Sequence, residues 1–176
     1  MLDHPGKYAR VELERRFLLD RVPEAVEGRT GRLIVDRYIV GTTLRLRRVE
    51  ALDTGESSYK LGQKTAPDPG DFSRAITTNI YLSDAEYAAL APLPANELRK
   101  RRFALDHAGD VYAIDVFEGA LTSLVLAEIT FETELELAAH PPPPFAVRDV
   151  SSELAYTGGA LAQAISPPGE RPSSVS

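Results

Sequence analysis

Cysteine is absent from the 176-residue chain, which excludes a disulfide, a thiolate metal ligand and a cysteine nucleophile. Long apolar runs are missing as well: the longest, residues 87–91, has five residues, against the roughly 20 that cross a bilayer. The N-terminus reaches charged residues without the apolar stretch of a secretory signal. From these absences we expect a cytoplasmic protein with no membrane partner.

Motifs of several enzyme classes are also missing. The chain has no G-x-x-x-x-G-K-[ST] loop, no G-x-S-x-G elbow and no H-E-x-x-H pair. A net charge of −6, from 20 cations and 26 anions, gives no overall attraction to nucleic acid. We therefore expect no nucleic-acid partner, and any chemistry must come from oxygen and nitrogen groups in another arrangement.

The composition that is present is that of a folded domain. Hydrophobic residues make up 43% and charged residues 26% of the chain, an ordinary globular balance. The length predicts one domain, over residues 1–165. We expect a monomer or a homodimer. Residues 166–176 are rich in proline and serine and are predicted to form a disordered tail.

Most of the domain alternates with a period of two, which indicates β-strands with one polar and one apolar face. A capping box at Ser83 and Glu86 predicts a helix over 83–92, and a second short helix is expected at 159–165. The fold class expected is mainly β. The predicted strands are 8–18, 32–40, 43–50, 57–64, 73–82, 97–106, 110–117 and 124–134.

One face of these strands carries charges at even offsets, and the other face is apolar. Solvation of the charged face of an open antiparallel sheet is the ordinary explanation. Two short helices, however, are little cover for the apolar face of eight strands, and closure into a barrel would remove the sheet edges and let either face point inward. The charged face carries Glu12, Glu14, Arg45, Arg47, Lys60, Lys64, Arg74, Lys100, Arg102, Asp115, Glu128 and Glu132.

An inward charged face would place more cations than carboxylates in a narrow lumen. Burial of an uncompensated charge is costly, so the surplus of arginine and lysine favours an anionic guest of high charge. Carboxylates beside the cations suggest a divalent ion, because Mg²⁺ prefers carboxylate oxygens and bridges phosphate oxygens. The pattern thus predicts a polyphosphate site.

The segment Glu12-Leu-Glu14-Arg-Arg16 resembles the E-x-E-x-K signature of the CYTH, or triphosphate tunnel metalloenzyme, family, with Arg16 in the lysine place. Further blocks resemble the family's motifs in the same order along the chain, over about residues 8–163. They are residues 38–40, 44–47, 60–64, 99–103, 114–119, 124–129 and 150–162.

The resemblance implies an eight-stranded antiparallel tunnel that holds a triphosphate and Mg²⁺ or Mn²⁺. It implies a phosphohydrolase that cleaves a terminal phosphoanhydride of inorganic or organic triphosphate, with Glu12, Glu14 and Glu128 as metal ligands. These three and Lys100 are the expected catalytic groups. The expected substrate-binding residues are Arg16, Arg45, Arg47, Lys60, Lys64, Arg74, Arg102 and Asp115.

The chain departs from the family pattern where acids are common. Ile76 and Thr78 follow Arg74, and Thr130 follows Glu128, with Glu132 as a substitute one step further. These losses leave open a second function, a module that binds triphosphate or polyphosphate without hydrolysis.

Overall fold

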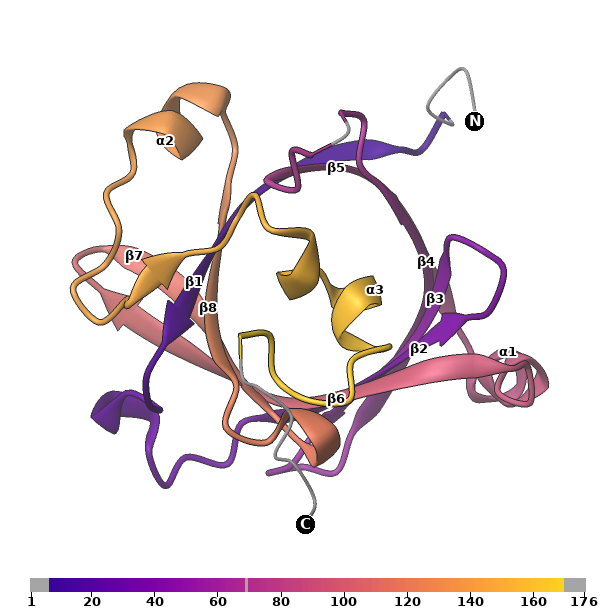
Figure 1. Cartoon of the computed structure of the whole chain (residues 1–176). Coiled ribbons are helices and arrows are strands. Elements are labelled where there is room, and N and C mark those ends of the chain that lie inside the picture. The colour runs from indigo at the N-terminus through magenta and orange to yellow at the C-terminus, as the bar shows by residue number, and fades with distance from the viewer. Residues whose placement is uncertain (1–6, 69, 170–176) are drawn as a thin grey trace, which may run out of the picture.

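The computed structural model describes residues 7–68 and 70–169. Its main feature is a closed antiparallel barrel of eight strands, in the order β5-β4-β3-β2-β6-β7-β8-β1, which closes because β1 also pairs with β5 (Figure 1). The strands are β1 (Arg10–Leu19), β2 (Arg32–Ile39), β3 (Leu44–Ala51), β4 (Ser57–Thr65), β5 (Arg74–Leu82), β6 (Ala95–His107), β7 (Asp110–Phe117) and β8 (Val125–Phe131). The predicted mainly β barrel is confirmed.

The helices are short and lie between or after the strands. Helix α1 (Asp84–Leu90) begins at the predicted capping box, while the predicted helix at 159–165 is reduced to α3 (Gly158–Leu161). Helix α2 (Glu134–Ala139) and the two-residue strand β9 (Arg148–Asp149), which pairs with β1, were not predicted. Single 3-10 turns are η1 (Glu24–Val26), η2 (Gly119–Leu121) and η3 (Leu154–Tyr156).

A first apolar cluster forms on the outer face of β1, β6, β7 and β8. Phe17, Ile114 and Ala127 are fully buried there, because η1 and the segment after α2 cover them with Val26 and Phe145. The apolar face of this half of the sheet therefore does point outward and finds a cover, and the charged face is left to line the lumen.

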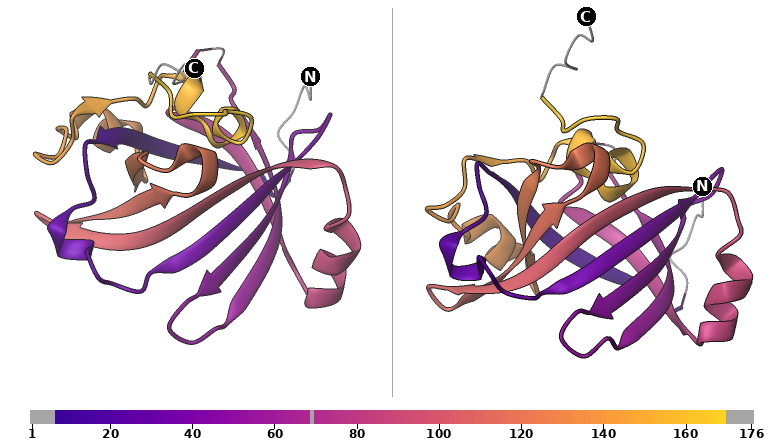
Figure 2. Two further views of the ribbon diagram at one scale, coloured as in Figure 1. Left: turned by 60° about the horizontal axis from the view of Figure 1, so that its bottom comes forward. Right: turned by 90° about the horizontal axis from the view of Figure 1, so that it is seen from below.

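A second apolar cluster fills one end of the lumen. Val150, Tyr156 and Leu161 of the C-terminal segment pack against inward-facing residues such as Leu98 and Leu126. Figure 1 shows α3 inside the ring of strands, and Figure 2 shows this segment over one end of the barrel. The charged part of the lumen is thereby separated from solvent on one side.

Part of the predicted tail continues against the barrel. Pro167 is buried, and the Tyr156 hydroxyl donates a hydrogen bond to the Pro168 carbonyl, at 3.3 Å. Residues 170–176 of that predicted tail lie outside the described residues. Across 7–68 and 70–169, none of the helices has the length and apolarity that a membrane crossing needs.

Candidate functional site: a cationic cavity in the barrel

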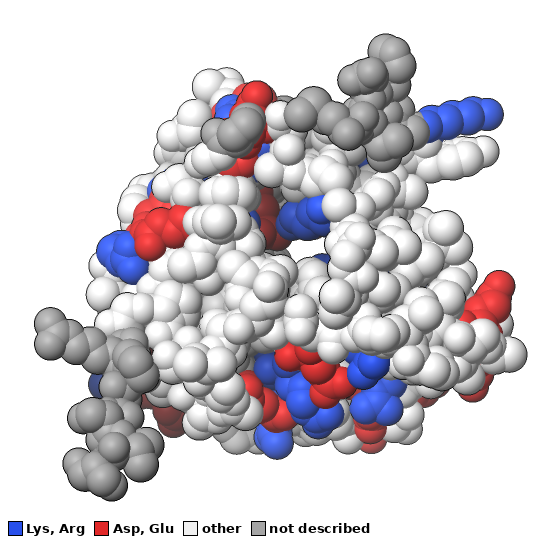
Figure 3. Space-filling model, turned by 45° about the vertical axis from the view of Figure 1, so that its right-hand side comes forward, with Lys and Arg blue, Asp and Glu red and all other residues white. Residues whose placement is uncertain are grey.

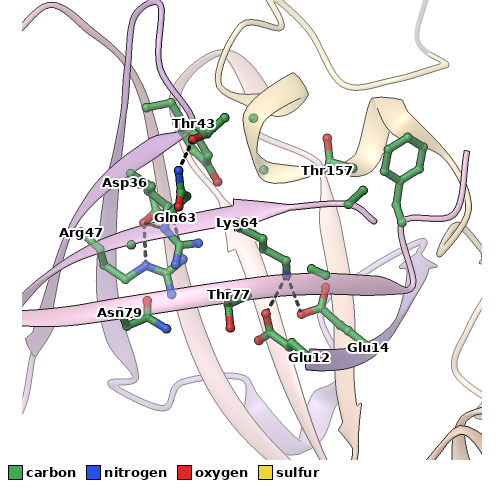
Figure 4. Close-up of a pocket in the computed structure, with 18 of the residues that line it drawn as sticks. Glu12, Glu14, Asp36, Thr43, Arg47, Gln63, Lys64, Thr77, Asn79 and Thr157 are labelled. Carbon is green, nitrogen blue, oxygen red and sulfur yellow. Dashed lines mark hydrogen bonds and ion pairs between the residues drawn. The ribbon is translucent and has the colours of Figure 1, made fainter. Parts of the chain in front are cut away.

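A cavity of about 400 Å³ opens into the lumen beside α3. Strands β1 to β6 and β8 line it, and Thr157, Gly158 and Gly159 border it at the plugged end (Figure 4). Basic side chains are visible within a hollow on the face shown in Figure 3. Of the predicted site residues, all but Asp115 line this cavity: Glu12, Glu14, Arg16, Arg45, Arg47, Lys60, Lys64, Arg74, Lys100, Arg102 and Glu128.

Two arginines of β3 share one buried carboxylate that sequence reasoning missed. Arg47 donates from Nε and Nη2 to the two oxygens of Asp36, at 2.6 and 2.7 Å, and Arg45 Nε lies 3.5 Å from Asp36 Oδ1. The Asp36 side chain is 1% exposed. Burial alone would raise the pKa of Asp36, but Arg47, and after it Arg45 and Lys100, hold that pKa below its ordinary value.

The cations of β6 are anchored in the same way. Asp115 on β7 accepts from Lys100 Nζ and, at 2.6 Å, from Arg102 Nε. Arg102 Nη2 also pairs with Glu128 on β8. Burial would raise the pKa of Glu128, but Lys100 and Arg102 lower it well below the ordinary value. Asp115 is fully buried behind the two cations and both its oxygens are engaged, so the structure gives it the role of holding Lys100 and Arg102, and its contact with substrate stays a prediction.

Within residues 7–68 and 70–169, Lys60 differs from the other cavity cations in having no acidic partner. No carboxylate of the described residues lies within ion-pair distance of its ammonium group, while Arg47 stands directly across from it on β3. Burial, and then repulsion by Arg47 and Arg45, lowers the pKa of Lys60. Burial and repulsion therefore outweigh the attraction of the more distant Asp36 and Glu12, and an anion in the cavity would offset them.

The two acids of β1 converge on one point. Lys64 Nζ lies 3.0 Å from Glu12 Oε2 and 3.6 Å from Glu14 Oε2 (Figure 4). Two carboxylates that already share one cation offer the donor set that Mg²⁺ takes from proteins, namely one or two carboxylates beside substrate phosphates. On this observation Glu12 and Glu14 fit a divalent ion.

A third protein ligand is not assembled with them. Glu128 is held by Arg102, and within 7–68 and 70–169 no group of three or more histidine, aspartate or glutamate side chains is close enough to hold a metal ion. The assignment of Glu128 as a metal ligand stays a prediction.

Arg16 lies at the site, but its donors are engaged within the protein. Its Nε donates to Glu14 Oε1 at 2.8 Å, its Nη1 to the Tyr156 carbonyl at 3.1 Å and its Nη2 to the Phe72 carbonyl at 2.7 Å. Its guanidinium is buried. The arginine therefore orients Glu14 and ties β1 to the C-terminal plug, and its direct contact with substrate stays a prediction.

The prediction for β5 has the wrong phase. Cross-strand pairing sets Thr77 opposite Lys64 and Asn79 opposite Gly62, and both Thr77 and Asn79 line the cavity. Ile76 and Thr78 have the opposite phase and do not line it. Thr77 and Asn79, rather than Ile76 and Thr78, thus occupy the inward positions of this strand.

Arg74 belongs to the outward phase of β5 and reaches only the rim. Its guanidinium pairs with Asp71 and Glu134, outside the cluster of cavity cations. Glu132, the proposed substitute acid, lines neither opening of the lumen. Besides Asp36, sequence reasoning missed the neutral polar wall of the cavity, formed by Thr43, Gln63, Thr77 and Asn79.

A second cavity, of about 950 Å³, opens at the opposite end of the barrel. It shares Glu12, Glu14, Arg102 and Glu128 with the first cavity, so both openings lead to the same charged residues. Its rim is formed by Arg29 from the segment before β2, by Arg32 at the start of β2 and by the β3–β4 hairpin. The two cavities therefore meet at the charged residues in the middle of the lumen.

Comparisons with known proteins agree with this geometry. No family model matches the chain. An inorganic triphosphatase of Nitrosomonas europaea is 28% identical over 160 residues, which cover 88% of this chain and 98% of that protein. The crystal structure of the inorganic triphosphatase NE1496 superposes with a TM-score of 0.57 at 23% identity, over 88% of this chain and 96% of the other.

A second solved structure, a putative adenylate cyclase from Bacillus halodurans, superposes with a TM-score of 0.52 at 16% identity, over 74% of this chain and 86% of the other. At these identities the structural likeness shows the fold. The relative that matches along nearly its whole length, the shared closed barrel and the ordered charged motifs on its strands all agree with the resemblance of this chain to the CYTH, or triphosphate tunnel, family.

Proposed function

We propose that the chain is a phosphohydrolase that cleaves a terminal phosphoanhydride of inorganic triphosphate, or of a related triphosphate, with Mg²⁺ or Mn²⁺. The resemblance to an inorganic triphosphatase along nearly the whole chain supports this proposal. The observation that carries it is Lys60: a partly buried cation, repelled by two arginines and without a carboxylate partner, calls for an anion in the cavity.

The proposal divides the work between the two sides of the lumen. Arg45, Arg47, Lys60, Lys100 and Arg102 would bind phosphate oxygens and neutralise the charge that develops on them as the bond breaks. Fixed cations in a water-poor cavity stabilise such charge more strongly than they would in water. The leaving group would be pyrophosphate when the substrate is inorganic triphosphate.

Glu12 and Glu14 are the residues that would hold the divalent ion, with Glu128 as a further candidate. The ion would supply additional positive charge at the phosphate oxygens and an ordered hydration shell. Lys64 now pairs with both acids, so an ion held by Glu12 and Glu14 would replace this contact.

A second candidate, binding without hydrolysis, has its own support. Glu12, Glu14 and Glu128 are each already paired with a cation, and the inward positions of β5 hold Thr77 and Asn79 instead of acids. Cations alone stabilise the bound substrate and the transition state about equally, which gives affinity without accelerating hydrolysis.

The deciding experiment measures turnover and binding side by side. Phosphate release would be followed with inorganic triphosphate, ATP and thiamine triphosphate, each with Mg²⁺ and with Mn²⁺, beside calorimetric titration of the same compounds. We expect metal-dependent release that is fastest with inorganic triphosphate. Tight binding with no release under every condition would favour the binding module.

Two matched variants test whether triphosphate binds in the cavity. Lys60→Met removes the cavity cation without an acidic partner, and Arg99→Met removes an outer-face cation whose side chain is 45% exposed. Triphosphate affinity should fall by about tenfold or more in the first variant, the effect of about 1.4 kcal/mol, and stay within twofold in the second. Equal losses in both variants would remove the assignment of the cavity as the binding site.

A further inference from the structure

Asp36 has no role in the function proposed above, although it is among the most buried side chains of the protein. It lies on β2 between two groups of cavity cations, with Arg47 opposite it on β3 and Lys100 beyond it on β6. Both its oxygens accept from Arg47, and Oδ1 also faces Arg45. The carboxylate therefore has no free oxygen for a metal ion or a substrate.

The atoms that Asp36 engages determine which atoms remain for a ligand. Asp36 accepts hydrogen bonds from Nε and Nη2 of Arg47, and it lies within ion-pair distance of Nε of Arg45. Among the described residues no other carboxylate lies within ion-pair distance of either guanidinium, and both line the cavity. Nη1 of Arg47 and the Nη groups of Arg45 are thus left without an acidic partner at the cavity wall.

An arginine that is not held has many rotamers, and ordering it at the moment of binding reduces affinity. A planar guanidinium fixed on one edge presents its other edge in a single direction. We infer that Asp36 is a positioning residue: it fixes the β3 arginine pair, Arg45 and Arg47, so that their remaining N–H groups meet phosphate oxygens without rearrangement. The inference rests on the proposed function only in taking a triphosphate as the ligand.

The direction in which the triphosphate affinity of Asp36→Asn changes separates a positioning role of Asp36 from an effect of its charge. Asp36→Asn removes a negative charge from the lumen, so electrostatics alone would make an anion bind more tightly. Loss of the anchored geometry would make it bind more weakly. We expect the affinity for inorganic triphosphate, titrated calorimetrically without metal, to fall by about tenfold, the direction that side-chain ordering predicts.

The outer face offers a matched control. Glu118 also bridges two arginines two positions apart on one strand, with Oε1 3.1 Å from Arg101 Nε and Oε2 3.5 Å from Arg99 Nε. Its bridge lies outside the barrel, and Glu118 does not line the cavity. Glu118→Gln should leave the triphosphate affinity within twofold of wild type, and the same loss as in Asp36→Asn would show an unspecific effect and overturn the inference.

Asp36→Glu covers the case in which the asparagine variant does not fold. It keeps the charge and moves the carboxylate by one methylene, so a pure charge effect predicts wild-type affinity and positioning predicts weaker binding. Circular dichroism and the melting temperature of each free variant establish the folded fraction. Unchanged or tighter binding in both folded variants would overturn the inference, whereas no binding by the wild type would instead reject the triphosphate site itself.

Discussion

Arg47→Met should destabilise the protein, although it removes one cation from a lumen that has a surplus of them. Relief of repulsion would predict a gain in stability. Asp36, however, is 1% exposed and takes two hydrogen bonds from Arg47, so the substitution leaves a buried carboxylate with only the longer contact to Arg45. The loss of the buried partner outweighs the relief.

The magnitude follows from this geometry. Removal of one partner of a buried ion pair costs about 3–5 kcal/mol, and the remaining Arg45 contact favours the lower end, about 3 kcal/mol. Because the total free energy of unfolding of a domain is about 5–15 kcal/mol, this loss is a large fraction of it. At about 2–4 °C for each kcal/mol in a domain of this size, the melting temperature should fall by about 6–12 °C.

The pH dependence has a definite sign. In the wild type the lowered pKa of Asp36 stabilises the fold above the ordinary aspartate pKa, and this stabilisation is lost as the pH falls through the folded-state value. Without Arg47, burial raises the pKa of Asp36, so the charged carboxylate destabilises the variant at neutral pH. The difference in the free energy of unfolding between Arg47→Met and wild type should therefore become smaller as the pH falls from neutral to about pH 4.

Urea unfolding followed by circular dichroism at neutral pH and near pH 4 measures both effects. Arg47→Met combined with Asp36→Asn should recover at least half of the loss, since no carboxylate is then buried without its closest cation and the Arg45 side chain, which loses its acidic partner, is 19% exposed. A free energy of unfolding for Arg47→Met within about 0.5 kcal/mol of wild type at neutral pH, as for a surface substitution, would refute the reasoning.

Three further predictions concern the tunnel. Glu14→Gln should lower metal-dependent phosphate release by at least about a hundredfold, since even the outer partners of metal ligands cost about 10–100-fold; titration without metal should show triphosphate binding that is no weaker. Arg74→Ala should leave triphosphate affinity within about twofold, because Asp71 and Glu134 already engage its guanidinium; a larger calorimetric loss would place Arg74 in the clamp. Lys60→Met should raise the free energy of unfolding at neutral pH, because the lowered pKa of Lys60 marks a charge that the fold disfavours, and this gain should vanish as the pH rises above its ordinary value of 10.5. If the gain in the free energy of unfolding persists above pH 10.5, or if there is no gain at neutral pH, the charge of Lys60 is not what destabilises the fold.

The strands and their closure could be predicted from the sequence because both faces keep the period of two. On β1 the odd positions Leu13 and Phe17 are buried outward and the even positions Glu14 and Arg16 face the lumen. Helix α2 carries a readable signal that was missed, a capping box between Thr133 and Glu136. Its helix is too short for a hydrophobic period, so the cap is the only local sign.

The phase of β5 could not be read, because neither of its faces is uniformly apolar. Ile80 faces outward yet is 56% exposed, and inward Thr77 and Asn79 are neutral. The alternation therefore gives no preference between the two registers, and only the pairing with β4 and β1 decides.

Asp36 was missed for a related reason. It precedes Arg37, so either residue of the charged pair could face inward, and its burial depends on Arg47, eleven positions later. The apolar plug at the end of the lumen was missed for the same reason, because Val150 and Leu161 meet their partners only once the barrel has closed. Long-range packing leaves no local period to read.

The pairing of β1 with β8 and β5 also governs how the chain can fold. The first strand must wait for partners that include the last barrel strand, more than a hundred positions later, so the closing contacts carry a large loop-closure entropy. We expect slow folding, with the hairpins of β2 to β5 forming early and β1 docking late. On the ribosome Glu14 and Arg16 would stay hydrated until β8 emerges, so truncation before Val125 should leave an unclosed sheet whose exposed edges are prone to aggregation.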